Sequence, residues 1–341
     1  MRKSEITIHD IAQKLNISAS TVSRALKNSP LISEATRNKI QAAATKMGYR
    51  PNSIAANLRT KKTNNIGIIV PWINRHFFSS VVSGVEEVAY NAGFTVTIAQ
   101  SNDNYQKEMQ IAKSFFYSRI DGVIVSFSME TRNFSHFRMF AERRIPLLFF
   151  DRDTTEFNAN RIVVDDFAGG EMVTNHLIEQ GCRNIAHISG PLHLSIYDAR
   201  LKGYLAALQK AGLPLLPGGI LHNRLTRYDG EKAILQLLTL KPAPDAVFCA
   251  NDTTALSAIM YLKKAGYKIP DDIAIVGFSD EPYSELITPS ISTIRQPGCE
   301  IGEKAAQLII SEIKGEITDK DYRKYIMHSD LIVRESSLKK V

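Results

Sequence analysis

The chain has 341 residues, 44% of them hydrophobic and 23% charged, which excludes a disordered or fibrous protein and allows two or three globular domains. Its net charge of +7 is unevenly distributed. Residues 1–63 contain 12 Lys and Arg against 3 Asp and Glu, whereas the remaining 278 residues contain 30 against 32. We therefore expect a basic head that binds a polyanion, followed by a near-neutral body.

Other features of the sequence exclude membrane proteins and disulfide-rich secreted proteins. No apolar run approaches the roughly 20 residues of a membrane-spanning helix, and residues 1–5 lead into polar sequence rather than into the apolar core of a signal peptide. Cys182, Cys249 and Cys299 are far apart, which favours reduced thiols over disulfides or a metal site. We expect a cytoplasmic protein with no membrane contact, no metal and no other cofactor.

The basic head contains the signals of three helices. Residues 7–10 have the Thr-x-x-Asp form of a helix start, and an apolar stripe follows them. Asn16 tolerates the left-handed backbone of a tight turn, and Ser18 can cap a second helix. A third helix is expected from about Glu34 to a stop at Gly48. Two short helices joined by a tight turn and buried by a third form a helix-turn-helix.

The second helix of such a motif enters the major groove of DNA with its N-terminal residues at the base edges. Arg24 can form a bidentate pair with guanine or hold a phosphate, whereas Ala19 and Ser20 offer only a methyl group and a hydroxyl. Helix spacing alone fits any three-helix bundle with a solvated basic face equally well, but the concentration of charge favours DNA. The head residues expected at the DNA are Thr7, Ser18, Ala19, Ser20, Thr21, Ser23, Arg24, Asn28 and Tyr49.

A short amphipathic segment follows the head. Pro51 favours a helix start, and Ile54 and Leu58 share one face. A helix of about two turns is too short to be stable alone in water, so we expect it to fold only against DNA or another chain. The expected domains are therefore a helix-turn-helix domain over residues 1–50, a hinge helix and linker over 51–65, and a body over 66–341.

Three segments of the head and hinge resemble the LacI/GalR family of bacterial transcription repressors: residues 8–12, residues 20–26, and residues 48–52 with the following Ala55 and Leu58. The resemblance implies a homodimer that binds a palindromic operator in double-stranded DNA. It also implies that the paired hinge helices, with Asn52 and Ala55, enter the minor groove, where Leu58 wedges between base pairs. A core or dimer contact is the alternative for Leu58.

From residue 66 onward, short apolar runs alternate with amphipathic helices, which predicts βαβ units and parallel sheets. The sequence pattern of residues 66–71 and 121–124 recurs at residues 185–191 and 245–248, which suggests two similar lobes with a cleft between them. The predicted fold is an all-α helix-turn-helix head followed by an α/β body of two doubly wound parallel-sheet lobes. The body resembles periplasmic sugar-binding proteins, with an N-lobe of about 66–164 and 295–324 and a C-lobe of about 165–294 and 325–341.

The expected elements of the body can be given by residue range. The predicted strands are 66–70, 94–99, 122–126, 146–150, 184–188, 245–249 and 272–276, with late strands near 291–294 and 325–332 that cross between the lobes. The predicted helices are 78–91, 104–118, 167–180, 195–211, 229–240, 252–265 and 298–314.

Ligands bind beyond the carboxyl ends of parallel strands, and here these ends carry carboxylates, amides, hydroxyls and aromatic rings. Such a set suits a neutral polyhydroxylated ligand, whose hydroxyls pair with polar groups while rings cover its apolar faces. The resemblance implies a small sugar or sugar derivative as the effector. The effector contacts that it implies are Phe77, Phe78, Asp151, Arg200, Asn251, Phe278 and Asp280.

Some of these positions have structural alternatives. Asp252, beside Asn251, is more simply explained as a helix cap than as a ligand contact. Arg200 could instead pair on the surface with Asp198 or Glu231.

The chain also departs from the family pattern. Residues 75–78 read Arg-His-Phe-Phe where many members have Asn-Pro-Phe-Phe. Because adjacent helical residues rarely face the same way, one of Phe77 and Phe78 could belong to the core. Ser279 stands where many members place an aspartate that binds vicinal hydroxyls. Either Asp280 substitutes for that aspartate or the ligand differs.

Motifs of the common α/β enzymes are absent from the sequence. No G-x-G occurs, and there is no P-loop, no G-x-S-x-G and no H-E-x-x-H. A sugar kinase-like enzyme fused to a DNA-binding head remains the alternative, although it would need a phosphate-binding glycine loop that we do not find. We predict a ligand-responsive, sequence-specific DNA-binding regulator, a repressor of carbohydrate-utilisation genes, and not an enzyme.

Overall fold

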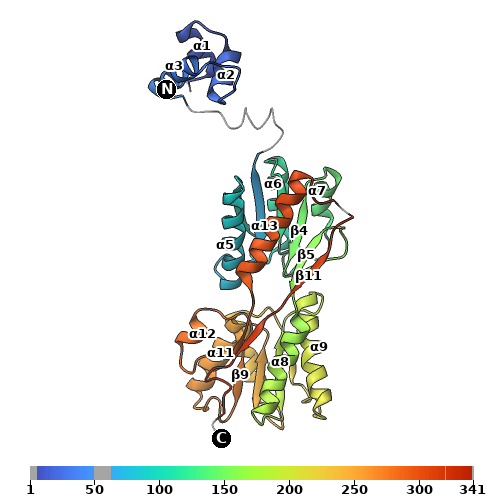
Figure 1. Cartoon of the computed structure of the whole chain (residues 1–341). Helices are drawn as coiled ribbons and strands as arrows, with labels where there is room; N and C mark the ends of the chain where they lie inside the picture. Colours follow the sequence, from blue (N-terminus) through green and yellow to red (C-terminus); the bar gives the residue numbers. More distant parts are fainter. Residues whose placement is uncertain (1–5, 50–62, 319, 340–341) are drawn as a thin grey trace. The chain divides into compact units, whose positions relative to one another are not determined.

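The computed structural model describes residues 6–49, 63–318 and 320–339. The chain divides into two compact units, Met1–Thr63 and Asn64–Val341 (Figure 1). The predicted hinge contacts Asn52, Ala55 and Leu58 lie outside the described residues. Within the described ranges no helix is long and apolar enough to cross a membrane.

The first unit is a bundle of three helices, α1 (Ile8–Leu15), α2 (Ala19–Leu26) and α3 (Glu34–Met47). Thr7 and Asp10 form a capping box at the start of α1, and Asn16 ends α1 in the left-handed conformation at φ 52°. The Ser18 hydroxyl accepts the backbone N–H of Thr21 at the start of α2. These local signals confirm the helix-turn-helix prediction. The core between the helices consists of Ile11, Ala12, Val22, Ala25, Ile40 and Ala44.

The N-lobe of the second unit is built on a six-stranded parallel sheet with the order β11-β5-β4-β3-β1-β2. Its strands are β1 (Asn65–Val70), β2 (Thr95–Gln100), β3 (Gly122–Val125), β4 (Leu147–Phe150), β5 (Asn160–Val164) and β11 (Lys324–Met327). Its helices are α5 (His76–Asn91), α6 (Tyr105–Tyr117), α7 (Arg138–Glu142) and α13 (Gly298–Lys314), with a 3₁₀ turn, η1, at Ser135–Phe137.

Alternate strand residues of the N-lobe face opposite helical layers. Ile68 and Leu148 pack in one cluster with α5 and α13, whereas Ile69 and Phe149 pack in another with α6 and α7. Helices α5 and α13 cross closely at Gly84, where a Cβ atom would lie 2.2 Å from the Cys299 carbonyl oxygen. Both faces of the sheet are therefore buried, as a doubly wound fold requires.

The C-lobe repeats this arrangement on a four-stranded parallel sheet with the order β7-β6-β8-β9. Helices α8 and α9 cover one face and α10 and α11 the other. The close crossing here is at Gly170, where a Cβ would lie 2.2 Å from the Arg200 carbonyl oxygen. The elements are β6 (Ile185–Ser189), β7 (Ile220–His222), β8 (Ala246–Cys249), β9 (Ala274–Val276), α8 (Asp166–Glu179), α9 (Ser195–Lys210), α10 (Arg227–Leu237), α11 (Asp252–Lys264) and α12 (Tyr283–Leu286).

Three chain segments connect the lobes (Figure 1). The first follows β5 and the second follows β10 (Thr293–Arg295). The third joins β11 to β12 (Asp330–Ile332), and β12 pairs antiparallel with β10. The sequence prediction placed residues 325–332 in the C-lobe, but β11 extends the N-lobe sheet through β5, so the last crossing falls after Met327. Strands β5 and β7 were not predicted, because each offers too few consecutive apolar residues for a pattern.

Candidate functional sites

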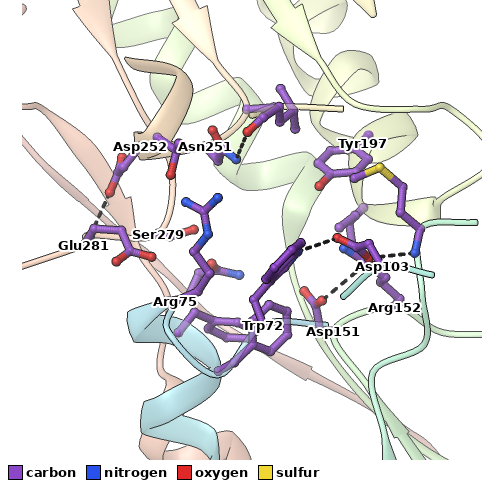
Figure 2. Close-up of a pocket in the computed structure, with 18 of the residues that line it drawn as sticks. Trp72, Arg75, Asp103, Asp151, Arg152, Tyr197, Asn251, Asp252, Ser279 and Glu281 are labelled. Carbon is purple, nitrogen blue, oxygen red and sulfur yellow. Dashed lines mark hydrogen bonds and ion pairs between the residues drawn. The ribbon is translucent and has the colours of Figure 1, made fainter. Parts of the chain in front are cut away.

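A cavity lies between the two lobes, at the carboxyl ends of their parallel strands (Figure 2). Trp72, Asp103, Asp151 and Arg152 line it from the segments that follow β1, β2 and β4 of the N-lobe. The C-lobe contributes residues of α9, of the start of α11 and of the turns after β7 and β9. The lining mixes charged, amide, hydroxyl and aromatic side chains, as the strand-end rule predicts.

In the N-lobe, a buried arginine joins the strand ends. Arg152 donates to the carboxylate of Asp103 and, over 2.7 Å, to the carbonyl oxygen of Phe127 after β3. Asp103 also accepts hydrogen bonds from Trp72 Nε1 at 2.9 Å and from the Met129 backbone N–H at 2.7 Å. Burial would raise the pKa of Asp103, but the charge and hydrogen bond of Arg152 hold it below its usual value. Asp103 is therefore an ionised and fully engaged carboxylate.

Of the two described N-lobe carboxylates that line the cavity, Asp151 is the one with acceptor capacity left. It follows β4 with a left-handed φ of 62°, accepts from Ser126 Oγ at 3.1 Å, and lies 3.9 Å from Arg152 Nε. Burial raises its pKa despite the nearby charges of Arg152 and Arg200. A buried carboxylate with open acceptor positions favours an occupant that donates hydroxyl hydrogen bonds.

The C-lobe has a buried arginine of its own, Arg200 on α9, which is 3% exposed. Its Nε and Nη2 bind Asp166 Oδ1 at 2.8 and 2.7 Å, and its Nη1 donates to the Ala250 carbonyl oxygen at 2.7 Å. The guanidinium lies 3.5 Å from the centroid of the Phe278 ring. Arg200 does not pair with Asp198 on the surface, because its guanidinium is buried against Asp166 and Asp198 binds Lys202.

Asn251 and Asp252 both have structural partners at the start of α11. Asn251 is the cap of this helix, since its Oδ1 accepts from Thr254 N at 2.8 Å, and its Nδ2 donates to the Leu225 carbonyl oxygen at 3.1 Å. Asp252, the expected cap, is instead fully buried and accepts from Thr293 Oγ1 at 2.7 Å. Burial raises the pKa of Asp252 to about 6.

Burial likewise raises the pKa of Asp166, but the charge and hydrogen bonds of Arg200 oppose this effect. Because the folded-state pKa of Asp252 exceeds the ordinary value of 3.8, protonation of Asp252 favours the folded state. That contribution to stability is complete below about pH 4 and is lost as the pH rises through about 6.

The four other predicted effector contacts divide into two pairs. Phe77 and Phe78 are both largely buried, their rings stand edge to face at 5.2 Å, and both border the cavity. Phe278 and Asp280 do not line this cavity. Phe278 has no exposed surface and lies beneath Arg200, and Asp280 pairs with Arg334 at 2.8 Å.

Backbone geometry explains the position of Asp280. Ser279 and Asp280 have successive positive φ angles of 119° and 53°. This turn presents Ser279 to the cavity and directs the Asp280 carboxylate to Arg295 and Arg334. Asp280 therefore does not substitute for a cavity aspartate.

Several cavity residues were not among the predicted contacts, namely Trp72, Asp103, Arg152, Tyr197 and Glu281. The strand-end rule marks Trp72, Asp103 and Arg152, because each lies within a few residues of the end of a predicted strand, but it does not by itself single them out as contacts. No comparable signal marks Tyr197, which lies within α9, or Glu281, which lies in the turn before α12.

Between the described residues of the two lobes, four polar contacts cross the cleft. On one side, the Glu281 carboxylate accepts from the His76 backbone N–H at 3.1 Å and so caps α5 from the opposite lobe. The other three contacts are His193 Nε2 to the Met129 carbonyl oxygen at 2.8 Å, Arg224 to Glu130 at 3.3 Å, and Ser195 Oγ to Asp153 at 2.9 Å. The lobes are therefore closed against each other around the cavity.

In the head, the predicted DNA contacts gather on and around α2. Ser18, Ser20, Arg24 and Asn28 are exposed, while Ala19, Thr21 and Ser23 are half-buried. The Ser18 hydroxyl lies 2.8 Å from both Ser20 Oγ and Thr21 Oγ1.

The remaining contacts lie beside α2. Thr7 is exposed, with its hydroxyl bound to Asp10, and Tyr49 packs against the head core. Within the described part of the chain, the Arg24 guanidinium forms no hydrogen bond or ion pair.

A helix-turn-helix head on a two-lobed body with a polar interlobe cavity defines the class of ligand-responsive DNA-binding regulators. Residues 7–52 match the model of bacterial regulatory proteins of the lacI family, and residues 174–337 match a periplasmic binding protein-like domain. The chain belongs to the LacI family: it is 32% identical to the HTH-type transcriptional repressor CytR of Escherichia coli (strain K12), over 98% of this chain and 97% of that protein.

Further relatives agree with this assignment. The ribose operon repressor of Haemophilus influenzae is 31% identical over 97% of this chain and 98% of that protein. The Lac repressor dimer bound to operator and the anti-inducer ONPF has the same fold, with a TM-score of 0.85 and 23% identity over 98% of this chain and 100% of that one. The transcriptional regulator CelR in complex with cellobiose gives a TM-score of 0.73 at 28% identity, over 97% and 100% of the two chains.

CytR and the ribose operon repressor are transcriptional repressors and CelR is a transcriptional regulator, and none of them supports the kinase alternative. The protein is therefore a ligand-responsive, DNA-binding transcriptional regulator and not an enzyme.

The pairing of Arg200 predicts a large effect of Asp166→Asn on stability. Removing one partner of a buried ion pair leaves the other charge uncompensated, which costs about 3–5 kcal/mol. The control is Asp198→Asn, which removes an exposed pair on the same helix as Arg200 and should cost less than about 1 kcal/mol. Urea unfolding measures the free energy of unfolding of the two variants. Equal losses of stability in both would contradict the structural role of Asp166.

Proposed function

We propose that the protein represses transcription by binding a palindromic operator as a homodimer, and that a small polyhydroxylated ligand in the interlobe cavity alters its operator affinity. The observation that carries the proposal is the position of the cavity, which both lobes line. An occupant would contact both lobes at once and would therefore favour one arrangement of them over another. A ligand shifts such an equilibrium only through different affinities for the two states.

The chemistry of the cavity supports a sugar or sugar derivative. Asp151 offers open acceptor positions, Trp72 and Tyr197 offer ring faces, and Asn251 contributes an amide. The names of relatives point the same way, since one is a ribose operon repressor and others were solved with cellobiose or D-xylulofuranose. We therefore assign the regulated genes to carbohydrate utilisation.

Replacing the open carboxylate should weaken ligand binding. Asp151→Asn keeps the size of the side chain but replaces an acceptor with a donor, so hydrogen bonds to ligand hydroxyls worth about 1.5–3 kcal/mol are lost. Calorimetry of the full-length protein against a panel of sugars and sugar acids measures this loss. Asp280→Asn is the matched control, because Asp280 lies outside the cavity, and its affinity should stay at the wild-type value. A loss in Asp280→Asn alone would reverse our assignment of the two aspartates.

The DNA-binding surface is assigned to the exposed side of α2. The net charge of +9 on residues 1–63 supplies affinity for any DNA through counterion release. Arg24, exposed and without a partner among the described residues, is the side chain on α2 that can form a bidentate pair with guanine. Because the DNA that this regulator binds is the bacterial chromosome, we place the protein in the cytoplasm.

Arg24→Ala should therefore reduce affinity for a selected operator much more than affinity for unrelated DNA. A bidentate base contact contributes about 1–3 kcal/mol of discrimination. Lys39→Ala, on the exposed surface of α3, removes the same charge and is the control for the general electrostatic effect. Fluorescence anisotropy with operator and scrambled duplexes separates base discrimination from the general electrostatic effect. An equal loss of affinity for both duplexes in Arg24→Ala would contradict base readout.

Homodimerisation is assigned to exposed apolar side chains of the body. In the C-lobe, Tyr228, Met260 and Leu286 are 64%, 47% and 81% exposed. They lie on α10, α11 and α12, where Arg227 contacts Met260 at 3.6 Å. In the N-lobe, β2 is an edge strand that exposes Ile98. A second copy of the chain is the occupant that fits, because a palindromic operator requires two heads.

Met260→Asp places a charge in this surface and should shift the protein from dimer to monomer. Sedimentation velocity measures the fraction of monomer, which should rise with dilution. Leu215→Asp is the control, because Leu215 is similarly exposed, at 45%, but lies in the loop before β7. A Met260→Asp variant that remains as dimeric as the control would place the interface elsewhere.

A further inference from the structure

Four arginines line the interlobe cavity, and one of them differs from the rest. The three that are paired are Arg152 with Asp103, Arg200 with Asp166 and Arg224 with Glu130. Arg75, the residue before α5, points into the cavity (Figure 2). Its guanidinium forms no hydrogen bond or ion pair with any of residues 6–49, 63–318 and 320–339.

None of the described groups near Arg75 pairs with it. Ser279, beside the Arg75 side chain in Figure 2, is uncharged, and the adjacent Asp280 is turned away to Arg334. Glu281 also lines the cavity, and both of its oxygens face the His76 backbone N–H, at 3.1 and 3.3 Å. Arg75 influences Glu281 only at longer range, where its charge opposes the effect of burial on the Glu281 pKa. The guanidinium therefore keeps all its donors for an occupant of the cavity.

A guanidinium enclosed by a ligand needs a partner. Closing the cavity around a neutral ligand would remove water from Arg75 without supplying a counter-charge, which is unfavourable. A carboxylate or a phosphate oxygen pair matches the geometry of the guanidinium and accepts two parallel hydrogen bonds. At the opposite side of the cavity, Asp151 accepts hydroxyl hydrogen bonds, so the two ends of the cavity favour different groups.

We propose that Arg75 is the specificity-determining residue of the cavity and that the effector is a polyhydroxylated compound with one oxyanion group, a sugar acid or a sugar phosphate. The hydroxyl groups bind at Asp151 and the oxyanion binds Arg75. This assignment rests on the proposed function, since it names the chemical class of the ligand for the same cavity.

The test compares matched ligands on the full-length dimeric protein by calorimetry. The panel pairs D-glucose with D-glucuronate and D-glucose 6-phosphate, and D-galactose with D-galacturonate and D-galactose 1-phosphate. We expect the oxyanion member of a set to bind at least about tenfold more tightly than its neutral member, because a hydrogen bond to a charged group contributes that much. Comparison of the acid with the phosphate identifies which oxyanion the site prefers.

Variants of Arg75 connect this preference to one side chain. Arg75→Gln should abolish the preference, and Arg75→Lys should retain part of it, because lysine keeps the charge without the bidentate geometry. Arg143→Gln makes the same change of net charge on the exposed end of α7 and should leave the preference intact. Circular dichroism melting of each variant confirms that it folds.

The outcomes separate this inference from the proposed function. Equal binding of neutral and oxyanion members, or a preference that survives in Arg75→Gln, overturns the inference and leaves a sugar-responsive regulator in place. Binding of the neutral members alone would likewise overturn the inference and leave a sugar-responsive regulator in place. If no member of the panel binds at millimolar concentration, both the inference and the proposed sugar-binding function are overturned.

Discussion

Each lobe of the body depends on one buried arginine that holds its strand ends together. In the N-lobe, Arg152 joins Asp103 after β2 to the backbone after β3. In the C-lobe, Arg200 joins Asp166 on α8 to the backbone after β8 and stacks on Phe278 after β9. A buried charge is tolerated only when it is paired and hydrogen-bonded, so these contacts restrict how the strand ends can move. These two networks therefore determine the geometry of the cavity between the lobes.

This arrangement separates structural from ligand-binding roles among the charged residues of the cavity. Asp103 and Asp252 in the lining, and Asp166, which pairs with the lining residue Arg200, are occupied by protein partners, so they determine the shape and electrostatic field of the site. Asp151 and Arg75 have hydrogen-bonding capacity left and lie where an occupant can use it. A ligand held by these two side chains would add contacts to those that already cross the cleft, and the preferred arrangement of the lobes would change with them.

The features that sequence predicts well in this protein are local ones. The capping box at Thr7, the left-handed Asn16 and the Ser18 cap are determined by neighbouring residues, so the three helices of the head were predicted closely. In the body, the alternation of strands and helices predicts the lobes, but β7 spans three residues and leaves too little pattern. Partners distant in sequence were not predictable: Asp166 meets Arg200 from 34 residues away, and the position of Asp280 depends on the φ of 119° at Ser279.

The central claim is that occupation of the interlobe cavity and binding of the operator are coupled. Coupling between two binding sites is reciprocal, so the factor by which a ligand changes operator affinity equals the factor by which operator changes ligand affinity. The direct measurement is the Kd of the tightest-binding ligand of the panel, determined with and without saturating operator duplex. We predict that the two Kd values differ by about fivefold or more, and by the same factor as the operator Kd measured with and without ligand. Identical ligand Kd values in the two conditions would contradict the account, because the cavity would then have no influence on DNA binding.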